Sequence, residues 1–315
     1  MRRARTLGLT GVLPLYLTVA TAAGFVDYRV RPLPDYGHAE YVPTVLDRTA
    51  PAPARYRVLG PHVYDALTRW TDLDPRDGWL VFRWLCLVGA LLAGHLYLRT
   101  WFATGAAVAG CLLAIVLLPL TYTNGWAHPD HLLELALFTL ACACVARGWS
   151  LAFVAVLALS ALNRETSAFL LPLFFLAGPV TRQRVVWSLA AVAVWGAVYL
   201  GLRWHLGWVS YDPWQAVQNI RYLGSWPVER DLYYRLFPWF FVLLVAPALV
   251  LVARTWAIQP RFNRIAAGLV TPVVLVVGFL FSSVIEPRVF TPVIPLVVPG
   301  VLFALFCQHD QNVML

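Results

Sequence analysis

The sequence predicts an all-α protein, a polytopic transmembrane helical bundle of about nine to ten spans, some of them short or broken. Two observations predict this class. Of the 315 residues, 60% are hydrophobic and only 13% are charged. The mean hydropathy of +0.68 also lies far above that of soluble domains. A soluble fold of this length would leave much apolar surface in water, so the composition indicates a membrane protein.

Seven apolar segments are long enough to cross about 30 Å of hydrocarbon. They are residues 7–26, 79–98, 103–122, 184–204, 236–253, 265–285 and 289–307. Three shorter apolar runs, 131–146, 149–162 and 166–178, are separated by Arg147-Gly148 and by Asn163-Arg164-Glu165-Thr166. We expect these three runs to form tilted, broken or partly inserted helices.

The first segment has two features that also occur in cleaved signal peptides. It begins with a positive stretch that contains Arg2, Arg3 and Arg5, and it ends in small residues at 20–22. Its apolar run is long for a signal peptide, so the favoured interpretation is an uncleaved first span. The whole chain, 1–315, is then a single transmembrane domain.

Charge sorts the connections between segments onto two sides. One set carries arginines at 2, 3, 5, 99, 147, 182, 184, 254, 261 and 264, with no acidic residue before Asp310. The positive-inside rule makes this set, and the N-terminus, cytoplasmic. The opposite set holds nearly every acidic residue and is predicted to be extracytoplasmic, in a multi-pass protein of the cell membrane. It comprises 27–78, 123–130, 163–165, 205–235 and 286–288.

This distribution of arginines does not indicate a nucleic-acid partner, despite the net charge of +8. Nucleic-acid binders gather basic residues on one face or stripe. Arginines placed between apolar runs are typical of topology signals instead. The expected surroundings are membrane lipids.

Two of the outer segments are large. Residues 27–78 are rich in Pro, Asp, Arg and Tyr, and the helical spacing of apolar residues predicts a surface helix around 61–71. Residues 205–235 are rich in Trp and Tyr. These aromatics form either a belt at the membrane interface or a platform for a lipid chain or a sugar ring.

Four polar clusters lie on the outer side, and their common side is the main sequence signal for function. Ionisable groups at the mouths of apolar runs are costly unless they are paired or face a cavity. The clusters are Asp35, His38 and Glu40; His128, Asp130 and His131; Arg164 and Glu165; and Glu286 and Arg288.

The first two clusters carry carboxylates and imidazoles. Asp35 and Glu40 are candidates for a general base that reaches an acceptor hydroxyl, or else solvated surface charges. The run His128-Pro129-Asp130-His131 suits hydrogen bonding to a polar ligand or a divalent metal. No further ligand has zinc spacing, so we expect neither a firm metal site nor a cofactor. Asp130 also suits the start of the next helix.

The arginines are the second type of candidate. Arg164 and Glu165 either neutralise each other and bend the chain, or Arg164 faces outward toward a phosphate, which a planar guanidinium binds well. Arg288, at the start of the last span, and Arg57, in the first outer loop, complete a candidate anion-binding set.

The order and common side of these motifs resemble the C-type (GT-C) membrane glycosyltransferases, which transfer a sugar from a polyprenyl-phosphate carrier on the outer or luminal face. Four features carry the resemblance. They are an acidic motif in the first outer loop (Asp35-Tyr36-Gly37-His38), an outer turn (His128-Pro129-Asp130-His131), an arginine–glutamate pair (Arg164-Glu165) and Glu286-Pro287-Arg288 at a late span.

The resemblance implies an inverting transferase that passes a sugar from a polyprenyl-phosphate donor to a glycan, lipid or protein acceptor. Asp35 would be the base, with Glu40 as a second carboxylate, while arginines hold the lipid phosphate: Arg57, Arg164 and Arg288. The acceptor or sugar would contact His38, His128, Asp130, His131, Glu165 and Glu286. An oxocarbenium-like transition state with a departing phosphate needs positive charge more than a proton, so a metal is optional.

Two other functions remain open. A catalytically silent scaffold or partner subunit of the same fold would keep the arginines for topology, lose only the acid, and bind another membrane protein. A lipid or solute transporter would need polar residues near the middle of its spans. The seven long apolar segments contain few such residues, which favours the transferase over the transporter.

Overall fold

The computed structural model describes residues 9–30, 41–118, 130–210, 214–224, 245–283 and 287–306. Within these ranges the regular elements are helices and there is no strand, which confirms the all-α class.

The first half comprises α1 (Leu9–Val30), α2 (Val42–Leu46), the 3-10 turn η2 (Ala54–Tyr56), α3 (Leu59–Thr71), α4 (Pro75–Leu98), α5 (Thr104–Leu117), α6 (Asp130–Arg147) and α7 (Ser150–Asn163). The second half comprises η5 (Glu165–Phe169), α8 (Leu170–Leu176), α9 (Arg182–Leu206), α10 (Ala216–Gly224), a helix at Val245–Arg254, η6 (Trp256–Ile258), α12 (Arg261–Ile265), the π-helical η7 (Ala266–Val270), α13 (Thr271–Phe281), η8 (Pro287–Phe290) and α14 (Val293–Phe306).

Three helices in the described residues are long and apolar enough to cross a membrane. They are α4, α9 and the continuous helix Arg261–Phe281 that α12, η7 and α13 form together. Shorter apolar helices occupy 10–25, 104–117, 245–254 and 293–306, and they overlap other segments predicted to be spans. By length and composition the chain is therefore compatible with a membrane protein, while the number of crossings stays a prediction.

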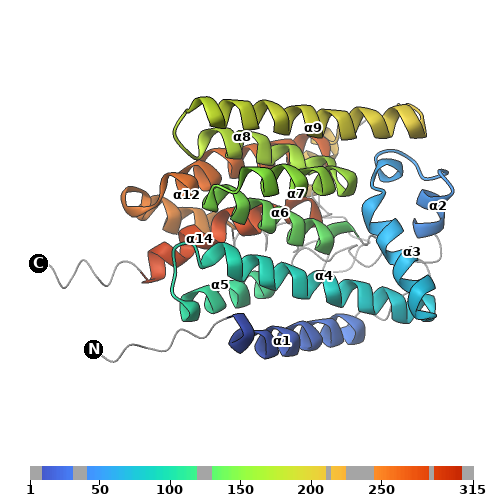
Figure 1. Cartoon of the computed structure of the whole chain (residues 1–315), viewed down its shortest axis with the longest axis horizontal. Coiled ribbons are helices and arrows are strands. Elements are labelled where there is room, and N and C mark those ends of the chain that lie inside the picture. Colours follow the sequence, from blue (N-terminus) through green and yellow to red (C-terminus); the bar gives the residue numbers. More distant parts are fainter. Residues whose placement is uncertain are drawn as a thin grey trace, which may run out of the picture.

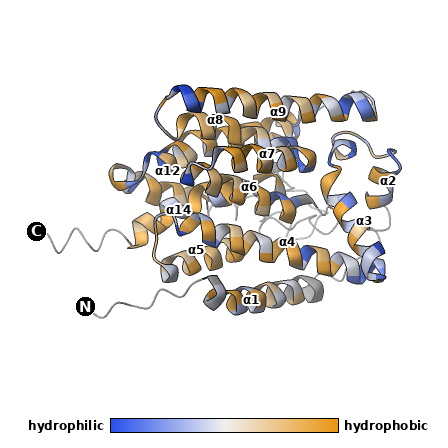
Figure 2. Ribbon diagram, in the orientation of Figure 1, coloured by the Kyte–Doolittle hydropathy of each residue, from blue (hydrophilic) through white to orange (hydrophobic). Residues whose placement is uncertain are grey.

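The longer helices lie side by side in the order α1, α4, α6, α7 and α9, from bottom to top in Figure 1. The contact between α4 and α6 is the most extensive, and α14 packs against both α5 and α6. Hydrophobic residues dominate along these helices, and hydrophilic residues gather at their ends, as at the turn between α8 and α9 (Figure 2). The apolar surface therefore covers the middle of the layers and the polar chemistry lies at the ends.

Local sequence signals explain where the two longest helices, α4 and α9, begin and where α9 ends. The side chain of Asp74 caps α4 by accepting a hydrogen bond from the Arg76 N–H at 2.9 Å, and Pro75 occupies the first helical position. The hydroxyl of Thr181 caps α9 in the same way. That helix ends at Gly207, whose φ of +84° favours glycine.

The predicted interruptions in residues 131–178 are present. α6 ends at Arg147, and Gly148 adopts a φ of +72° before α7 begins at Ser150. α7 ends at Asn163 because Arg164 is extended, with φ −156° and ψ +143°. The 3-10 helix η5 then starts a new, short helical segment at Glu165.

A helix also forms around 61–71, where a surface helix was expected. This helix, α3, packs across the beginning of α4. The Tyr64 hydroxyl donates to the Pro75 carbonyl at 2.7 Å, and its ring meets Trp79 edge to face at 5.4 Å. Burial, together with the nearby charges of Asp74 and Asp65, raises the pKa of Tyr64 to about 12. The hydroxyl therefore stays a hydrogen-bond donor at neutral pH.

The close approach of α3 to α4 at Gly78 makes a first prediction. A Cβ added at Gly78 would overlap the Thr68 methyl group, which is held in place because the Thr68 hydroxyl donates to backbone carbonyls of its own helix. We expect Gly78→Ala to lower the free energy of unfolding by about 1–3 kcal/mol, measured by thermal unfolding of the purified protein. Thr68→Ser, which removes the methyl group, should restore stability in the double variant.

Gly105→Ala on α5 is the matched control, since a Cβ there meets nothing within 4 Å. Equal melting temperatures for Gly78→Ala and Gly105→Ala would contradict the described packing of α3 on α4.

Candidate functional site

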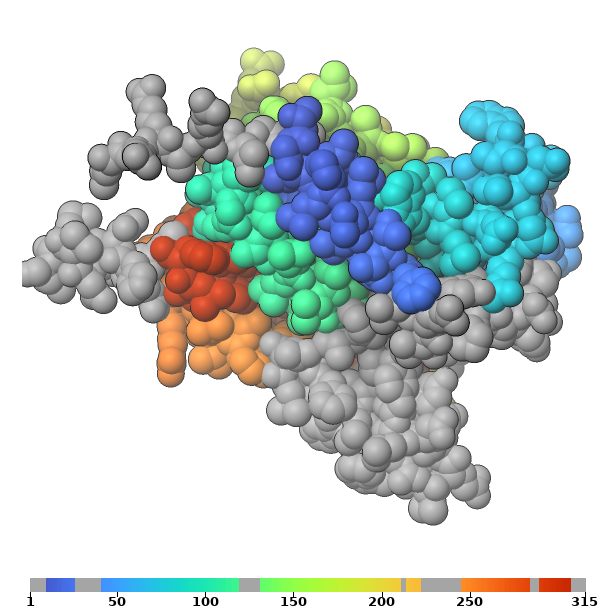
Figure 3. Space-filling view, turned by 90° about the horizontal axis from the view of Figure 1, so that it is seen from below, coloured from blue at the N-terminus to red at the C-terminus, as the bar shows by residue number. Residues whose placement is uncertain are grey.

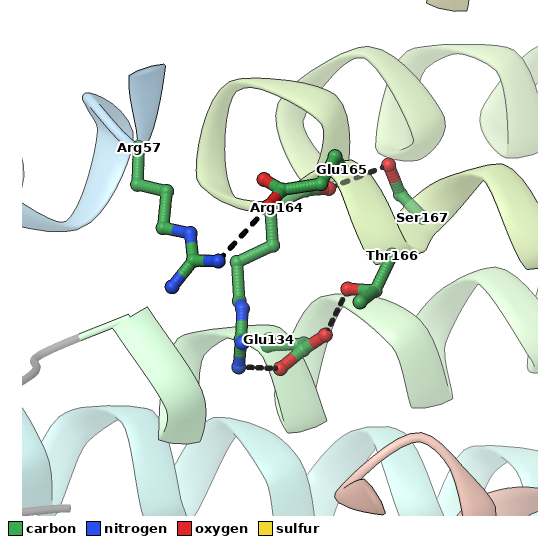
Figure 4. Close-up of polar contacts among 6 residues, drawn as sticks. All are labelled: Arg57, Glu134, Arg164, Glu165, Thr166 and Ser167. Atoms are coloured by element: carbon green, nitrogen blue, oxygen red, sulfur yellow. Dashed lines mark hydrogen bonds and ion pairs between the residues drawn. The ribbon is translucent and has the colours of Figure 1, made fainter. Parts of the chain in front are cut away.

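The candidate site is a set of charged and hydroxyl side chains at the end of the layers that α3 covers, where α3 contacts both α6 and α7. Figure 4 shows six of its members, which come from the segment between η2 and α3, from α6, and from Arg164 with the η5 residues that follow it. This connection is held locally, because the Ser167 hydroxyl donates to the Arg164 carbonyl at 2.8 Å. The extended Arg164 backbone therefore sends the side chains of Arg164 and Glu165 in different directions.

The inner part of the site is a buried ion pair. Arg164 Nη1 lies 2.6 Å from Glu134 Oε2, and the two side chains are only 3% and 5% exposed. The Thr166 hydroxyl donates a hydrogen bond to the other oxygen of Glu134. Both carboxylate oxygens thus have a donor, which offsets the desolvation cost of the buried charges.

The outer part is a second ion pair with more access to solvent. Arg57 Nη2 lies 2.9 Å from Glu165 Oε1, and these side chains are 11% and 30% exposed. Burial by itself raises the pKa of Glu165. The positive charge of Arg57, its hydrogen bond and the charge of Arg164 together lower the pKa by more than burial raises it, so the pKa of Glu165 lies below that of an ordinary glutamate. Glu165 is therefore a stable carboxylate at neutral pH.

The structure changes the interpretation of Arg164 and Glu165 as a mutually neutralising pair. Each has a direct partner in a distant part of the chain: Glu134 for Arg164, and Arg57 for Glu165. The side chain of Arg164 points into the helical layers rather than outward (Figure 4).

Contacts with the C-terminal end of α9 hold Arg57 in position. The guanidinium of Arg203 lies between the rings of Tyr56, at 4.3 Å, and Tyr199, at 3.5 Å. The Tyr56 hydroxyl donates to the Gly207 carbonyl at 2.9 Å and accepts from the Val209 N–H at 3.0 Å. Because Tyr56 directly precedes Arg57, these contacts fix where the Arg57 side chain begins.

A further hydrogen bond ties the other side of the connection to α9. The Trp195 indole N–H donates to the Ser167 hydroxyl at 3.0 Å, which itself donates to the Arg164 carbonyl. The turn that carries Arg164 and Glu165 is thereby fixed from two neighbouring elements.

The structure brings together only part of the predicted site. Arg57, Arg164 and Glu165 meet, and His131 is fully buried on α6 one turn before Glu134. Asp130 and Arg288 belong to α6 and η8, but their side chains are not among those described. The other predicted site residues lie outside the described residues: Asp35, His38, Glu40, His128 and Glu286.

Glu134 and Thr166 are the site residues that sequence reasoning missed. Glu134 is a lone acid inside the apolar run 131–146, and a buried carboxylate is costly without a partner. That cost was the signal that could have identified it. Thr166 was recognised only as part of the interruption after α7.

The described residues contain no group of three or more His, Cys, Asp and Glu side chains that could hold a metal ion. Cys86, Cys111, Cys142 and Cys144 are buried free thiols. The described site contains two carboxylates and two guanidinium groups, arranged as an inner and an outer ion pair. No protein-family model, curated protein or solved structure matches the chain.

The inner ion pair makes a second prediction. Glu134→Leu leaves Arg164 buried without this carboxylate, and we expect it to lower the free energy of unfolding by about 3–5 kcal/mol. The double variant Glu134→Leu/Arg164→Leu should regain most of that loss, because it removes both buried charges. Chemical or thermal unfolding of the purified variants measures both effects.

The matched control is Asp65→Asn, at the exposed Arg69–Asp65 pair, where the 3.0 Å contact should contribute at most about 1 kcal/mol. A loss at Glu134 no larger than the loss at Asp65 would show that the inner pair is not a structural constraint.

Proposed function

We propose that the chain is a multi-pass membrane glycosyltransferase of the C-type (GT-C) architecture. It takes a sugar from a polyprenyl-phosphate carrier and transfers it, with inversion, to a glycan, lipid or protein acceptor on the extracytoplasmic face of the cell membrane. The N-terminus is cytoplasmic, and the connections that contain Arg57 and Glu165 are extracytoplasmic.

One observation carries this proposal: charged side chains from three distant stretches of a mostly apolar chain meet at one end of the helical layers. Arg57, Glu134 and the Arg164–Glu165 connection are brought together by the ion pairs at 2.6 and 2.9 Å. Ionisable groups at the boundary of apolar helices are costly, and such groups commonly mark a functional site. The three candidate spans and the shorter apolar helices support the membrane setting.

The outer and inner ion pairs of the site suggest different roles for their side chains. The outer pair is the more exposed, so Arg57 is the proposed first ligand of the donor phosphate. A guanidinium has five N–H donors, so an arginine bound to a carboxylate can also bind a phosphate. Arg164 adds positive charge from the buried inner pair and holds Glu134. Arg288 is the third proposed phosphate ligand, as the family resemblance implies. Glu165 keeps Arg57 oriented, and Glu165 and His131 are proposed contacts of the acceptor or sugar.

The proposed reaction is a single displacement. Asp35, with Glu40 as the second carboxylate of the first loop, takes the proton from the acceptor hydroxyl. The hydroxyl oxygen bonds to the anomeric carbon while the bond from that carbon to the phosphate oxygen breaks. The lipid phosphate leaves with the electron pair, and the arginines stabilise its growing negative charge. His38, His128, Asp130 and Glu286 complete the acceptor side.

A catalytically silent scaffold or partner subunit is the second candidate function. One observation favours it: in the described cluster the two carboxylates and the two arginines neutralise each other in formal charge. Ion pairs of this kind also occur where their only role is to join helices. An activity measurement separates the two functions.

The third prediction concerns Asp35. The purified full chain in lipid nanodiscs, given labelled polyprenyl-phosphate sugars and a panel of acceptors, should transfer the label. Asp35→Asn should reduce the rate by about 100-fold or more, as the loss of a general base does. Asp65→Asn, which alters another acid of the first outer segment, is the matched control and should leave the rate unchanged. Transfer by no donor and acceptor pair, or equal rates for Asp35→Asn and the unaltered chain, favours the scaffold.

The fourth prediction concerns sidedness. Reporter fusions at Gly37, His128, Ile220 and Pro287 should all report an extracytoplasmic location, because the positive-inside rule places the arginine-rich connections in the cytoplasm. A cytoplasmic report from any of the four positions would contradict a single site built from these clusters.

A further inference from the structure

Four arginines gather at the end of the helical layers opposite the ion-pair site, and the proposed reaction uses none of them. Arg182 and Arg184 lie at the start of α9. Arg261 and Arg264 lie at the start of the continuous helix Arg261–Phe281. The two starts are close to each other because α12 contacts α8, the helix that precedes α9. These four residues are called the basic cluster below.

The basic cluster lies at the left end of the molecule in Figure 1, where α9 begins. α9 runs for 25 residues, about 37 Å, before its last turn contacts Tyr56 beside the ion-pair site. The space-filling view shows the orange segment that contains α12 at the surface of the same end, beside α14 (Figure 3). In the proposed orientation this end faces the cytoplasm.

Among the described residues, no acidic side chain forms an ion pair with the basic cluster. The sequence explains this, because residues 166–211 and 232–285 contain no Asp or Glu. α8, α9 and the helix that begins at Arg261 therefore carry no negative side chain. The predicted cytoplasmic connections contain one acid, Asp310, which lies outside the described residues and has one charge against four.

Arg184 is held in place by neutral groups. Its guanidinium donates to the carbonyls of Phe174 and of Phe175, the latter at 3.1 Å, and lies 5.2 Å from the centre of the Phe174 ring. In this position its positive charge interacts with that of Arg261. Both arginines lie in the first turn of a helix, where the helix dipole adds to the positive potential. An anion bound to both guanidinium groups would remove this repulsion.

Exposed apolar side chains border the basic cluster and favour a lipid over a soluble anion. Val180, in the turn before α9, and Trp256, shortly before α12, are both exposed. Exposed apolar residues continue along α9 at Val186 and Leu189, and along the helix that begins at Arg261 at Leu269. A molecule with an anionic head and apolar chains matches both kinds of surface.

We propose that the basic cluster binds one anionic glycerophospholipid of the cytoplasmic leaflet. The phosphodiester lies on the guanidinium groups of Arg184 and Arg261, and the acyl chains lie along the exposed apolar side of α9. The bound lipid joins the turn before α9 to α12. This inference rests on the membrane setting and orientation of the proposed function, but it does not depend on glycosyl transfer. The proposed sugar donor binds at the opposite end of the helices.

Native mass spectrometry of the full chain tests the proposal, after incubation with equal concentrations of phosphatidylglycerol and phosphatidylcholine. We expect one phosphatidylglycerol to be retained about tenfold more tightly than phosphatidylcholine, the size of one hydrogen-bonded charge contact. Arg261→Gln should abolish most of this preference without lowering the melting temperature, because Arg261 is exposed. Arg261→Lys, which keeps the charge, should keep part of the preference.

Arg69→Gln on α3 is the matched control, since it removes an exposed positive charge outside the basic cluster, and it should bind phosphatidylglycerol as the unaltered chain does. Equal retention of the two phospholipids, or an unchanged preference in Arg261→Gln, would overturn the proposal. Displacement of phosphatidylglycerol by an equal concentration of inorganic phosphate would assign the arginines to a soluble anion and also overturn it. The measurement needs neither sugar donor nor acceptor, so its outcome is separate from that of the transfer assay.

Discussion

The buried ion pair between Glu134 and Arg164 is the constraint on which the candidate site depends. Neither charge is stable alone in this apolar setting, so the start of α6 and the connection after α7 must stay together. The side chain of Arg164 is directed inward. The side chain of the next residue, Glu165, points in a different direction and contacts Arg57 near the surface. The buried contact between Glu134 and Arg164 thus fixes the position of the inner ion pair and directs Glu165 toward Arg57 in the outer pair.

The outer layer depends in turn on α9. Arg203 between two tyrosine rings and the hydrogen bonds of Tyr56 hold the segment before Arg57 against the end of that helix. Arg57 and Glu165 are 108 residues apart in sequence. The segment that carries each of them is nevertheless held in place by contacts with α9 or the residues that follow it. Such rigid support is what a site needs if it is to bind a phosphate without reorganising.

Composition and apolar length predicted the helical class and the interruptions near Gly148 and Arg164, because these depend on local sequence. The partners within the site could not be predicted in this way. Arg57 and Glu165 were both candidates, but their contact depends on how distant segments pack. Glu134 was missed because an acid in an apolar run acquires a clear role only once its partner, 30 residues later, is known.

The most direct measurement is an experimental structure of the chain bound to a polyprenyl phosphate. We expect the phosphate about 3 Å from the Arg57 guanidinium, with the Asp35 carboxylate facing the same cleft. A structure in which Asp35 lies far from Arg57, Arg164 and Arg288, with no cleft joining them, would contradict the proposed transferase and leave only the helical architecture.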